Sequence, residues 1–356
     1  MVEYEIAVIG GDGIGPEVTR EAMKVLDSAA DVFGFSTRRT EYPFGTDHYL
    51  ATKEIFPDAA FAEVRQKQAI YLGAIGDPRV PVGLIEYGVI AKMRFELDLY
   101  INLRPIKLFD ASLCPLKDKR PQDIDMVIVR ENTEDAYSGS HGFTHKGQAL
   151  EVATQTMVYT RHGVERAIRF AFECARERNK RKQVTLIDKA NAVRAQDIWT
   201  RTFEEVAREY PDCTTDHAYI DAACMWMIKN PEWFDVAVTP NLFGDIITDL
   251  GAMLQGGLGI AASGNIHPGR VSLFEPIHGS APKHARKNTA CPVAAILAVG
   301  MMLDYLGEKP AATAIEGSVA DLLSSKRLKG VSAGDHPTTF VGDTVAAELR
   351  AVAARV

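Results

Sequence analysis

Short apolar runs alternate with longer segments of helical period along this chain, and this alternation restricts the fold more than any other feature. We expect five strands, at residues 6–9, 69–75, 125–129, 184–187 and 235–238. Between them, apolar residues recur at helical spacing, as in Val18, Ala22, Val25 and Ala29. Strands separated by helices favour an α/β fold. The almost entirely apolar run at 124–129 is typical of a strand covered on both faces.

Length, charge and cysteine usage narrow the class of protein. The 356 residues favour two domains or one large α/β unit. The formal net charge of −7 excludes a general attraction to nucleic acid or to an anionic membrane. No apolar run reaches the roughly 18 to 20 residues of a membrane span. The N-terminus has no basic segment of a secretion signal, and the five cysteines form no Cys-x-x-Cys pair, so we expect a cytoplasmic protein.

The glycine cluster after the first predicted strand, GGDGIGPE at 10–17, is ambiguous by itself. A dinucleotide fingerprint needs G-x-G-x-x-G, and Pro16 stands where the third glycine belongs. Pro16 and Gly34 are instead the start and stop signals of a helix. The glycines therefore form either a tight turn from strand to helix or part of a ligand site, where Asp12 and backbone N–H groups contact the ligand.

Two glycine-rich segments lack a helical period. The segment GSHGFTHKGQALE, at 139–151, is expected to form an arm or a flap. The segment GGLGIAASGNIHPG, at 256–269, is expected to be a long loop without regular structure. Loops of that length in compact domains are often functional, so this segment is a candidate part of a binding site.

Asp245 and Asp249 carry the strongest chemical signal. They lie four residues apart in a helical pattern, so both carboxylates lie on one helix face and repel each other. A hard cation such as Mg²⁺ or Mn²⁺ would neutralise them through oxygen ligands; the alternative is an exposed acidic face. The apolar residues around the pair favour the metal. Asp221, where an apolar run gives way to a helix, is a third candidate ligand.

One lysine and three arginines are further candidates. Lys189 follows a predicted strand, where burial would lower its pKa enough for the amine to act as a base; the alternative is an exposed lysine. The arginines, near strand or loop ends, are Arg94, Arg104 and Arg130. Guanidinium groups bind carboxylates in bidentate fashion, so three of them indicate a polyanionic small substrate, although each alone is more often an ion-pair residue.

Seven motifs, in order along essentially the whole chain, resemble the β-decarboxylating dehydrogenases, which include isopropylmalate, isocitrate, homoisocitrate, tartrate and D-malate dehydrogenases. The motifs are GDGIGPEV, MRFELDLYINLRP, VRENTEDAYSG, DKANAV, YIDAA, NLFGDIITDLGAML and EPIHGSAP. The stretches LGAIGDP, RFELD and GDIITDL through AASGNI look most like bacterial isopropylmalate dehydrogenases. The resemblance implies oxidative decarboxylation of a 2-hydroxy-3-carboxy acid of the 3-isopropylmalate type to a 2-oxo acid, CO₂ and NAD(P)H.

The resemblance also implies a two-domain α/β fold with a central mixed sheet that is not a Rossmann fold. One domain, 1–100 plus 254–356, would bind the cofactor and contain both chain ends. The other, 101–253, would make most of the contact in a homodimer, with an arm near 139–158. The opening glycines would belong to an active-site loop beside the cofactor, and the main dinucleotide loop would be 275–292.

Roles follow from the motifs residue by residue, again as what the resemblance implies. Three aspartates, the last from the neighbouring subunit, match the Mg²⁺ or Mn²⁺ ligands: Asp245, Asp249 and Asp221. Arg94, Arg104 and Arg130 match the clamps for substrate carboxylates. Lys189, also from the neighbour, matches the residue that handles the 2-hydroxyl proton, and Tyr137 matches the acid that protonates the enol. The matching cofactor residues are Glu275, His278, Gly279, Ser280, Ala281, Lys283, His284 and Cys291.

The segment before Arg94 departs from the family pattern. Isopropylmalate enzymes have two leucines in the side-chain pocket where this chain has Ile90 and Ala91. Isocitrate enzymes have Ser and Asn where this chain has Gly88 and Ile90, which disfavours isocitrate. Ala91 shortens one wall. Tyr87 and Lys92 could contact a polar or anionic substituent, the alternative being that they lie on the helix surface, which is favoured for Lys92. The alternative substrate is therefore a polar or anionic malate analogue, such as tartrate, D-malate, homoisocitrate or 3-phosphonomethylmalate.

The cofactor loop departs as well. NAD enzymes of the family usually have GSAPD, whose Asp binds the adenosine ribose, whereas this chain has Lys283 there. Lys283 and His284 resemble the Lys-Tyr pair of NADP-dependent isocitrate dehydrogenases, and Arg286 and Lys287 add positive charge. We therefore predict that NADP is used, with NAD as the alternative.

Two alternatives lie outside this enzyme class. A Rossmann hydroxyacid dehydrogenase would need a regular glycine fingerprint, and a non-catalytic homologue would have lost some of the residues that bind the metal or transfer protons.

Overall fold

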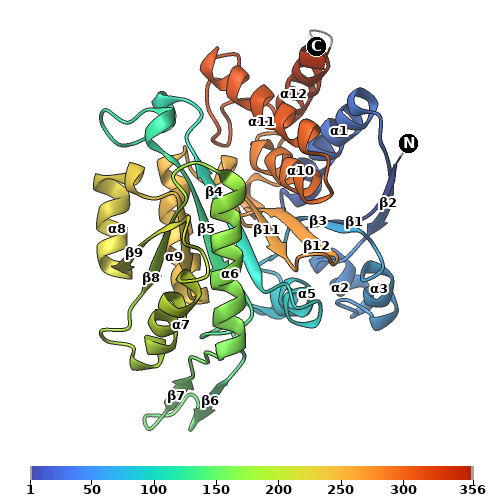
Figure 1. The fold of residues 1–356 in the computed structure, drawn as a ribbon. Helices are drawn as coiled ribbons and strands as arrows, with labels where there is room; N and C mark the ends of the chain where they lie inside the picture. Colours follow the sequence, from blue (N-terminus) through green and yellow to red (C-terminus); the bar gives the residue numbers. More distant parts are fainter. Residues whose placement is uncertain (1, 354–356) are drawn as a thin grey trace. The chain divides into compact units, whose positions relative to one another are not determined.

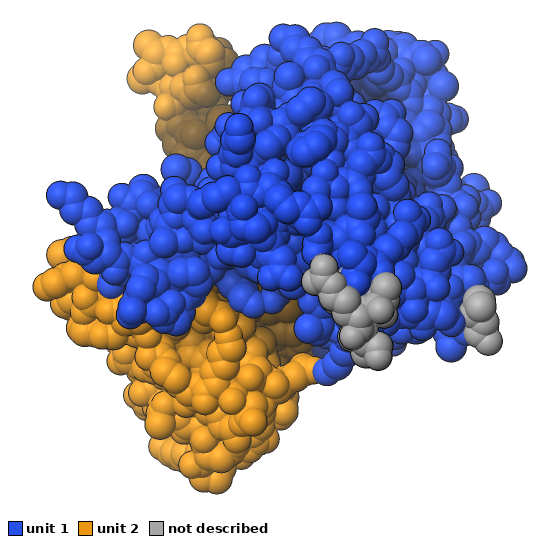
Figure 2. Space-filling view, turned by 90° about the horizontal axis from the view of Figure 1, so that it is seen from above, with its two compact units in different colours: residues 1–99, 107–124, 252–356 blue, residues 100–106, 125–251 orange. Residues whose placement is uncertain are grey.

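The computed structural model describes residues 2–353 and divides the chain into two compact units (Figures 1 and 2). Unit 1 comprises Met1–Leu99, Lys107–Ile124 and Ala252–Val356, and unit 2 comprises Tyr100–Ile106 and Asp125–Gly251. The predicted central domain, 101–253, differs from this division at 107–124. That segment clusters with unit 1 because Lys107 pairs with Glu316 and Lys326 donates to Asp110 at 2.5 Å.

Unit 1 contains a mixed sheet with the strand order β2-β1-β3-β12-β11. Its strands are β1 (Glu3–Gly11), β2 (Ser36–Tyr42), β3 (Ala69–Ala74), β11 (Ala262–Ile266) and β12 (Ser272–Pro276). The pairs β1–β2, β1–β3 and β3–β12 are parallel, whereas β11–β12 is antiparallel. The parallel strands therefore present their carboxyl ends at one edge, where ligand sites of α/β sheets form.

Helices cover both faces of the unit 1 sheet (Figure 1). The helices are α1 (Gly15–Phe33), α2 (Thr46–Thr52), α3 (Asp58–Val64), α4 (Leu84–Glu86), α5 (Lys92–Glu96), α10 (Val293–Tyr305), α11 (Lys309–Ser324) and α12 (Thr338–Ala353). Side chains alternate along β3: Tyr71 donates to the Ala295 carbonyl oxygen of α10 at 2.9 Å, whereas Ile70 and Leu72 join a cluster with Phe56 and Phe61. Every residue of β3 is buried, as expected for a strand between two helical layers.

Unit 2 has the strand order β4-β5-β10-β8-β9. Its strands are β4 (Ile101–Lys107), β5 (Asp125–Glu131), β8 (Gln183–Asp188), β9 (Thr214–Tyr219) and β10 (Val236–Thr239), and its helices are α6 (Arg161–Arg178), α7 (Asp197–Ala207), α8 (Ile220–Lys229) and α9 (Asn241–Leu254). β10 pairs in parallel with β5 and β8, and β8 with β9. α6 packs on α7 and covers these strands. A separate hairpin of β6 (His141–Thr144) and β7 (Val152–Gln155) lies within the predicted arm.

The five predicted strands are confirmed as β1, β3, β5, β8 and β10. The expectation of a structureless loop at 256–269 is wrong. This segment contains the 3-10 turn Leu258–Ile260 and strand β11, whose small residues are buried and pair with β12. Short 3-10 turns also occur at Ala111–Leu113, Pro121–Asp123, Arg194–Gln196, Pro231–Trp233 and Pro282–His284. Among residues 2–353, no helix is long and apolar enough to cross a membrane.

The segment between α4 and α5 winds as a π-helix, Tyr87–Ala91, which the sequence did not predict. Such segments accommodate an extra residue in a turn and occur often at functional sites. Here the helix packs so closely on Ile55 that a Cβ at Gly88 would overlap Ile55 Cγ2. A serine at Gly88, as in isocitrate enzymes, would therefore displace Ile55 or the helix.

We expect Gly88→Ala to lower the free energy of unfolding by about 1–3 kcal/mol, the usual cost of overpacking. Gly317→Ala is the matched control, because a Cβ at this exposed position of α11 meets no described atom within 4 Å. The control should be neutral or stabilising by up to about 1 kcal/mol. Thermal and urea unfolding measure both variants. Equal stability of Gly88→Ala and Gly317→Ala would contradict the packing described for the π-helix.

Candidate active site

The glycine cluster after β1 is joined to the loop after β12. The Ile14 N–H donates to the Ser280 carbonyl oxygen at 2.8 Å, and a Cβ at Gly13 would overlap that same oxygen. Gly13 also has φ +59°, so only glycine suits this close approach. The glycine cluster therefore forms a strand-to-helix turn. It also packs directly against the loop that we expected to bind a dinucleotide.

Asp12 has a structural part in this turn. Its carboxylate accepts from the Thr46 N–H at 2.6 Å, the Thr46 hydroxyl at 3.1 Å and the Gly76 N–H at 2.9 Å. Asp12 is buried, so these bonds hold together the segments that follow β1, β2 and β3. These bonds alone account for a buried aspartate at this position, without a ligand contact. Asp12 also lines a pocket.

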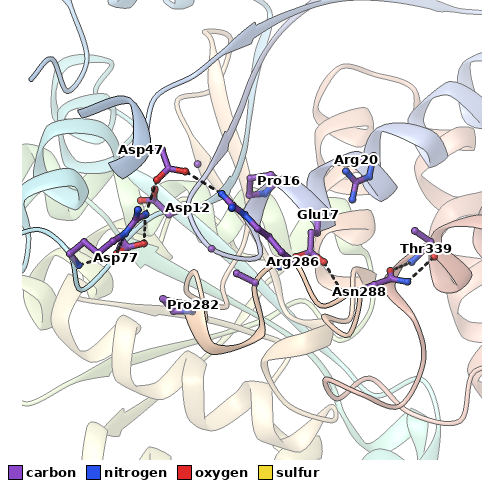
Figure 3. A pocket seen from close by; sticks show the side chains of 14 residues that line it. Asp12, Pro16, Glu17, Arg20, Asp47, Asp77, Pro282, Arg286, Asn288 and Thr339 are labelled. Carbon is purple, nitrogen blue, oxygen red and sulfur yellow. Dashed lines mark hydrogen bonds and ion pairs between the residues drawn. The ribbon is translucent and has the colours of Figure 1, made fainter. Parts of the chain in front are cut away.

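That pocket, of about 670 Å³, lies beside the predicted cofactor loop (Figure 3). Charged side chains dominate its lining: Asp12, Glu17, Arg20, Asp47, Asp77, Arg79 and Arg286. Arg79 donates to Asp77 and Asp47 at 2.8 Å, and the Arg286 guanidinium lies 3.6 Å from the Asp47 carboxylate. The hollow is therefore polar and suits a charged ligand.

The predicted cofactor residues after β12 differ in exposure. The side-chain Nε2 of His278 is shielded from solvent and has no hydrogen-bond partner among the described residues, and burial lowers the pKa of this imidazole. Lys283 is exposed and makes no ion pair within residues 2–353. Cys291 is buried, and this burial raises the pKa of its thiol to about 12. The unpartnered His278 ring nitrogen and the exposed Lys283 ammonium are both chemically suited to a polar, anionic cofactor.

Arg94 and Glu275, predicted to bind substrate and cofactor, meet in unit 1. Arg94 Nε donates to the side-chain oxygen of Asn265 at 2.9 Å, and its Nη2 lies 3.3 Å from the Glu275 carboxylate. Asn265 Nδ2 also donates to Glu275, at 2.7 Å. Sequence reasoning did not single out Asn265. It lies in β11, inside the segment that was expected to be a loop, so its position opposite β12 was not foreseeable.

The three residues that we predicted to line the substrate pocket differ in exposure and packing within the π-helix. Tyr87 is 62% exposed, whereas Ile90 packs against the apolar core of unit 1 and Ala91 is half-buried. The neighbouring Lys92 is turned away, because its Nζ donates to Asp58 at 2.7 Å and lies over the Phe61 ring at 5.1 Å. Tyr87 is therefore the side chain of this segment that is most available to a ligand.

In unit 2, the candidate residues follow the parallel strands β5, β8 and β10. Tyr137 comes after β5, Lys189 directly after β8, and helix α9 after β10. Because these strands are parallel, their carboxyl ends lie at one edge of the sheet, which is where α/β sheets place ligands. The fold thus explains why residues that are widely spaced in sequence share one region of unit 2.

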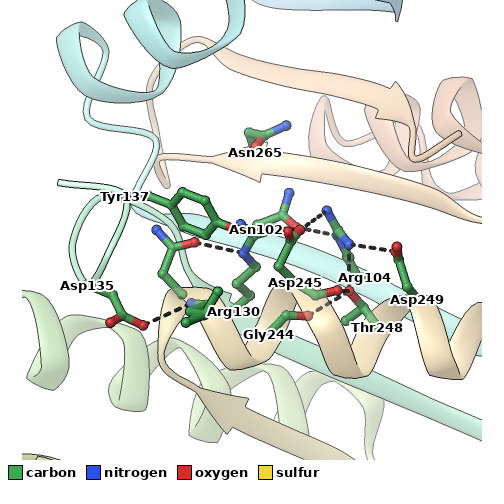
Figure 4. Close-up of polar contacts among 12 residues, drawn as sticks. Asn102, Arg104, Arg130, Asp135, Tyr137, Gly244, Asp245, Thr248, Asp249 and Asn265 are labelled. Carbon is green, nitrogen blue, oxygen red and sulfur yellow. Dashed lines mark hydrogen bonds and ion pairs between the residues drawn. The ribbon is translucent and has the colours of Figure 1, made fainter. Parts of the chain in front are cut away.

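Two buried arginines face the acidic side of α9 (Figure 4). Arg130 Nη1 donates to Asp245 Oδ1, and Arg104 Nη2 lies 3.5 Å from the same oxygen. Arg104 Nη1 lies 3.6 Å from Asp249 Oδ1. The structure therefore brings Arg104, Arg130, Asp245 and Asp249 together in unit 2, and their roles in binding substrate and metal stay predictions.

Neighbouring side chains orient both guanidinium groups. Arg130 Nε donates to Asn241 at 2.9 Å, and Arg104 donates to Asn102 and Thr248 at 2.5 Å each. A Cβ at Gly244 would come 2.5 Å from Arg130 Cγ, so glycine lets Arg130 lie against α9. Sequence reasoning missed these supports; the spacing of Asn102 and Arg104 on one strand face was the available signal.

The carboxylates on α9 fit a hard cation in their chemistry. Burial and the charge of Asp245 raise the pKa of Asp249, and the two arginines oppose this shift. Both side chains remain open to solvent, at 41% for Asp245 and 64% for Asp249, so oxygen atoms are available as ligands. In the described part of the chain, no three His, Cys, Asp or Glu side chains cluster closely enough to hold a metal. Asp245 and Asp249 lie together on α9, whereas Asp221 pairs with Lys189.

Tyr137 lies against the same carboxylate. Its hydroxyl donates to Asp245 Oδ2 at 3.0 Å, and the Arg130 guanidinium carbon lies 5.6 Å from its ring centroid. The hydroxyl thus contacts a carboxylate, while the ring lies near a guanidinium group, at the carboxyl edge of the sheet. Such a position is compatible with proton transfer to a bound small molecule.

Lys189 and Asp221 form a separate pair. Lys189 Nζ donates to Asp221 Oδ1 at 2.5 Å, and this hydrogen bond lowers the pKa of the Asp221 carboxyl. Asp221 is 68% exposed at the start of α8. The expected burial of Lys189 is only partial, because 24% of its side chain is exposed.

A chain of partly buried hydrogen bonds joins the Lys189 segment to α9. The Lys189 N–H donates to Gln196 at 2.7 Å, and Gln196 donates to the Tyr159 hydroxyl at 2.8 Å. Tyr159 donates to Asp135 at 2.7 Å, and Asp135 accepts from the Leu242 N–H at 2.9 Å. These residues, which sequence reasoning missed, connect the two groups of predicted catalytic residues within unit 2.

Comparison with known proteins agrees with the predicted family. Residues 5–341 match the family described as isocitrate/isopropylmalate dehydrogenase. The 3-isopropylmalate dehydrogenase of Thermobifida fusca (strain YX) is 48% identical over 345 residues, which cover 96% of this chain and 96% of that protein. The 3-isopropylmalate dehydrogenase of Corynebacterium aurimucosum is 48% identical over 353 residues, covering 98% and 100%.

Solved structures of similar proteins confirm the predicted α/β fold. The isocitrate dehydrogenase from Methylococcus capsulatus superimposes with a TM-score of 0.88 and 34% identity, over 98% of this chain and 99% of that one. The β-decarboxylating dehydrogenase from Thermococcus kodakarensis, in its apo form, gives 0.79 and 32%, over 99% and 97%. The chain therefore belongs to the isocitrate/isopropylmalate dehydrogenase family and is an oxidoreductase that acts on a CH–OH group.

Proposed function

We propose that the protein catalyses the oxidative decarboxylation of a 3-substituted malate of the 3-isopropylmalate type to a 2-oxo acid and CO₂. The observation that carries this proposal is the convergence of two buried arginines on the paired carboxylates of α9. Cationic clamps beside oxygen ligands suit a substrate with two carboxylates that binds together with a divalent cation. The names of the relatives from T. fusca and C. aurimucosum support the same substrate type.

Asp245 and Asp249, with Asp221 from a second subunit, would hold Mg²⁺ or Mn²⁺. When bound, the cation supplies Lewis-acid stabilisation of the negative charge that develops as CO₂ leaves. Arg104 and Arg130 keep N–H groups directed at the same face of α9, where they bind a substrate carboxylate. Arg94, held by Asn265 and Glu275 in unit 1, is the third proposed carboxylate clamp.

Two side chains would move protons. Lys189, contributed by the second subunit, handles the proton of the substrate 2-hydroxyl at its Nζ, where Asp221 now accepts its hydrogen bond. Tyr137 donates its hydroxyl proton to C3 of the substrate after decarboxylation, and its hydrogen bond to Asp245 holds the hydroxyl beside the proposed metal ligands. The loop at 275–292 would hold NAD(P), which would supply the oxidant for C2.

A homodimer is part of this proposal. Several apolar side chains of α8, α9 and the hairpin are exposed in the single chain: Met225, Ile228, Ile246, Phe143, Leu150 and Val152. Apolar surface of this kind marks interaction sites.

The five free cysteines are consistent with a reducing compartment, and we propose a cytoplasmic location.

With Mn²⁺ and NADP, 3-isopropylmalate should be oxidised, as followed by the absorbance of the reduced nicotinamide. EDTA should abolish the reaction and excess Mn²⁺ should restore it, because the α9 carboxylates need a cation. The same assay with tartrate, D-malate, homoisocitrate and 3-phosphonomethylmalate tests the second candidate, a polar malate analogue, which the exposed Tyr87 and the short Ala91 favour. Turnover that is insensitive to EDTA would refute the metal-dependent mechanism.

We further propose that NADP is preferred to NAD because exposed Lys283 can pair with the 2′-phosphate. Lys283→Asp should raise the KM for NADP at least about tenfold, equivalent to roughly 1.4 kcal/mol, and leave the KM for the malate substrate unchanged. Lys117→Asp makes the same charge change at another exposed lysine and should have no effect. An unchanged ratio of kcat/KM for NADP and NAD in Lys283→Asp would exclude this role.

Shared active sites can be tested by mixing inactive variants. Lys189→Ala and Asp245→Asn should each be inactive alone. After co-refolding in equal amounts, hybrid dimers should restore about one quarter of wild-type activity, because half of the dimers would each have one intact site. If Lys189 and Asp245 serve the site of their own chain, the mixture should stay inactive.

A further inference from the structure

The proposed cofactor loop holds an unusual backbone. Three of its non-glycine residues have positive φ: Ala281 (39°), Arg286 (61°) and Asn288 (53°). A Cβ disfavours this left-handed region, so such residues persist only where surrounding contacts enforce them. The loop therefore depends on an anchor outside itself.

Glu17 provides that anchor for two of the three residues. Its carboxylate accepts a hydrogen bond from the Arg286 N–H and a second one, at 3.1 Å, from the Asn288 N–H. Glu17 lies in the first turn of α1 and is only 8% exposed. Figure 3 shows Glu17 and the Asn288 contact beside the pocket. A buried carboxylate that accepts two backbone N–H groups is a strong, charge-assisted contact.

Other contacts secure the far side of the loop. The Thr338 N–H donates to the Asn288 carbonyl oxygen, and the Thr339 N–H donates to the Asn288 side chain, both at 3.0 Å. The Arg286 backbone is thus held while its side chain stays 88% exposed over the pocket, with Asp47 at 3.6 Å. Fixing the backbone directs this guanidinium outward, where an anionic group can reach it.

We infer that Glu17 is a positioning residue that forms the dinucleotide loop before the cofactor arrives. This inference rests on the proposed use of NADP. Because the loop is already ordered, binding loses less conformational entropy, and Arg286 already lines the pocket beside the loop. The glutamate of GDGIGPEV acts through two backbone N–H groups about 270 residues later and does not need to contact the cofactor.

Cofactor-free protein gives the first measurement. Hydrogen–deuterium exchange at Arg286 and Asn288 should be at least about tenfold faster in Glu17→Ala, because both amides lose their acceptor. Glu17→Gln, which keeps one acceptor oxygen, should show a smaller increase. The control is Glu21→Ala, one turn further along α1, whose carboxylate pairs with Lys24 and not with the loop. Unchanged exchange at both amides in Glu17→Ala and Glu17→Gln would overturn the inference.

Binding measurements then separate positioning from general stability. Calorimetry should show a Kd for NADP at least about tenfold higher in Glu17→Ala, with the Kd for 3-isopropylmalate and Mn²⁺ within twofold of wild type. Equal weakening of both ligands would show that Glu17 only stabilises the fold and would overturn the inference. If Glu17→Ala does not fold, Glu17→Gln gives the same comparison. Faster exchange without NADP binding in the wild type would instead refute the proposed cofactor, while leaving the anchoring role intact.

Discussion

Mutual neutralisation of Asp245 and Asp249 by Arg104 and Arg130 is the interaction on which the unit 2 site depends. The carboxylates repel each other on one helix face, and the buried guanidinium groups would be costly without acidic partners. The two arginines therefore reduce the repulsion between the carboxylates, and the carboxylates offset the cost of burying the arginines. Gly244 lets Arg130 lie close to α9. The charges meet only when β4, β5 and α9, which carry them, are correctly placed relative to one another. The site is thus as much a structural element of unit 2 as a place for chemistry.

In unit 1, specific contacts hold an irregular polar loop in place at the edge of the sheet. The glycine turn after β1 and the loop after β12 contact each other through Ile14 and Ser280, and Glu17 secures the strained part. Parallel pairing of β1, β3 and β12 makes this meeting possible, because it brings three carboxyl ends together. The opening glycines are thereby explained by contact with a loop that is remote in sequence.

Periodicity predicted the elements whose burial is strong and local, such as β3, β5 and α1. It failed for β11, because the small residues of ASGNI have no apolar alternation and the strand exists through pairing with β12. It also failed for the π-helix, in which Gly88 lies close against Ile55, a contact that periodicity does not report. Motifs identified the charged groups that converge on α9. The supporting residues Thr248, Tyr159 and Gln196 could not be predicted, since they contact Arg104 or each other across long stretches of sequence. The spacing of Asn102 and Arg104 on one strand face was, in contrast, an available signal.

The discontinuity of unit 1 has a consequence for biosynthesis. Strand β3 pairs with β12, whose register partners lie about 200 residues later, and α1 packs against α12. The unit 1 sheet therefore cannot be completed until most of the chain has left the ribosome, whereas β5, β8, β9 and β10 of unit 2 all lie within one continuous stretch. Unit 2 can fold first, while the edge of β3 that pairs with β12 and the face of α1 that packs on α12 lack their partners until the end of the chain is made.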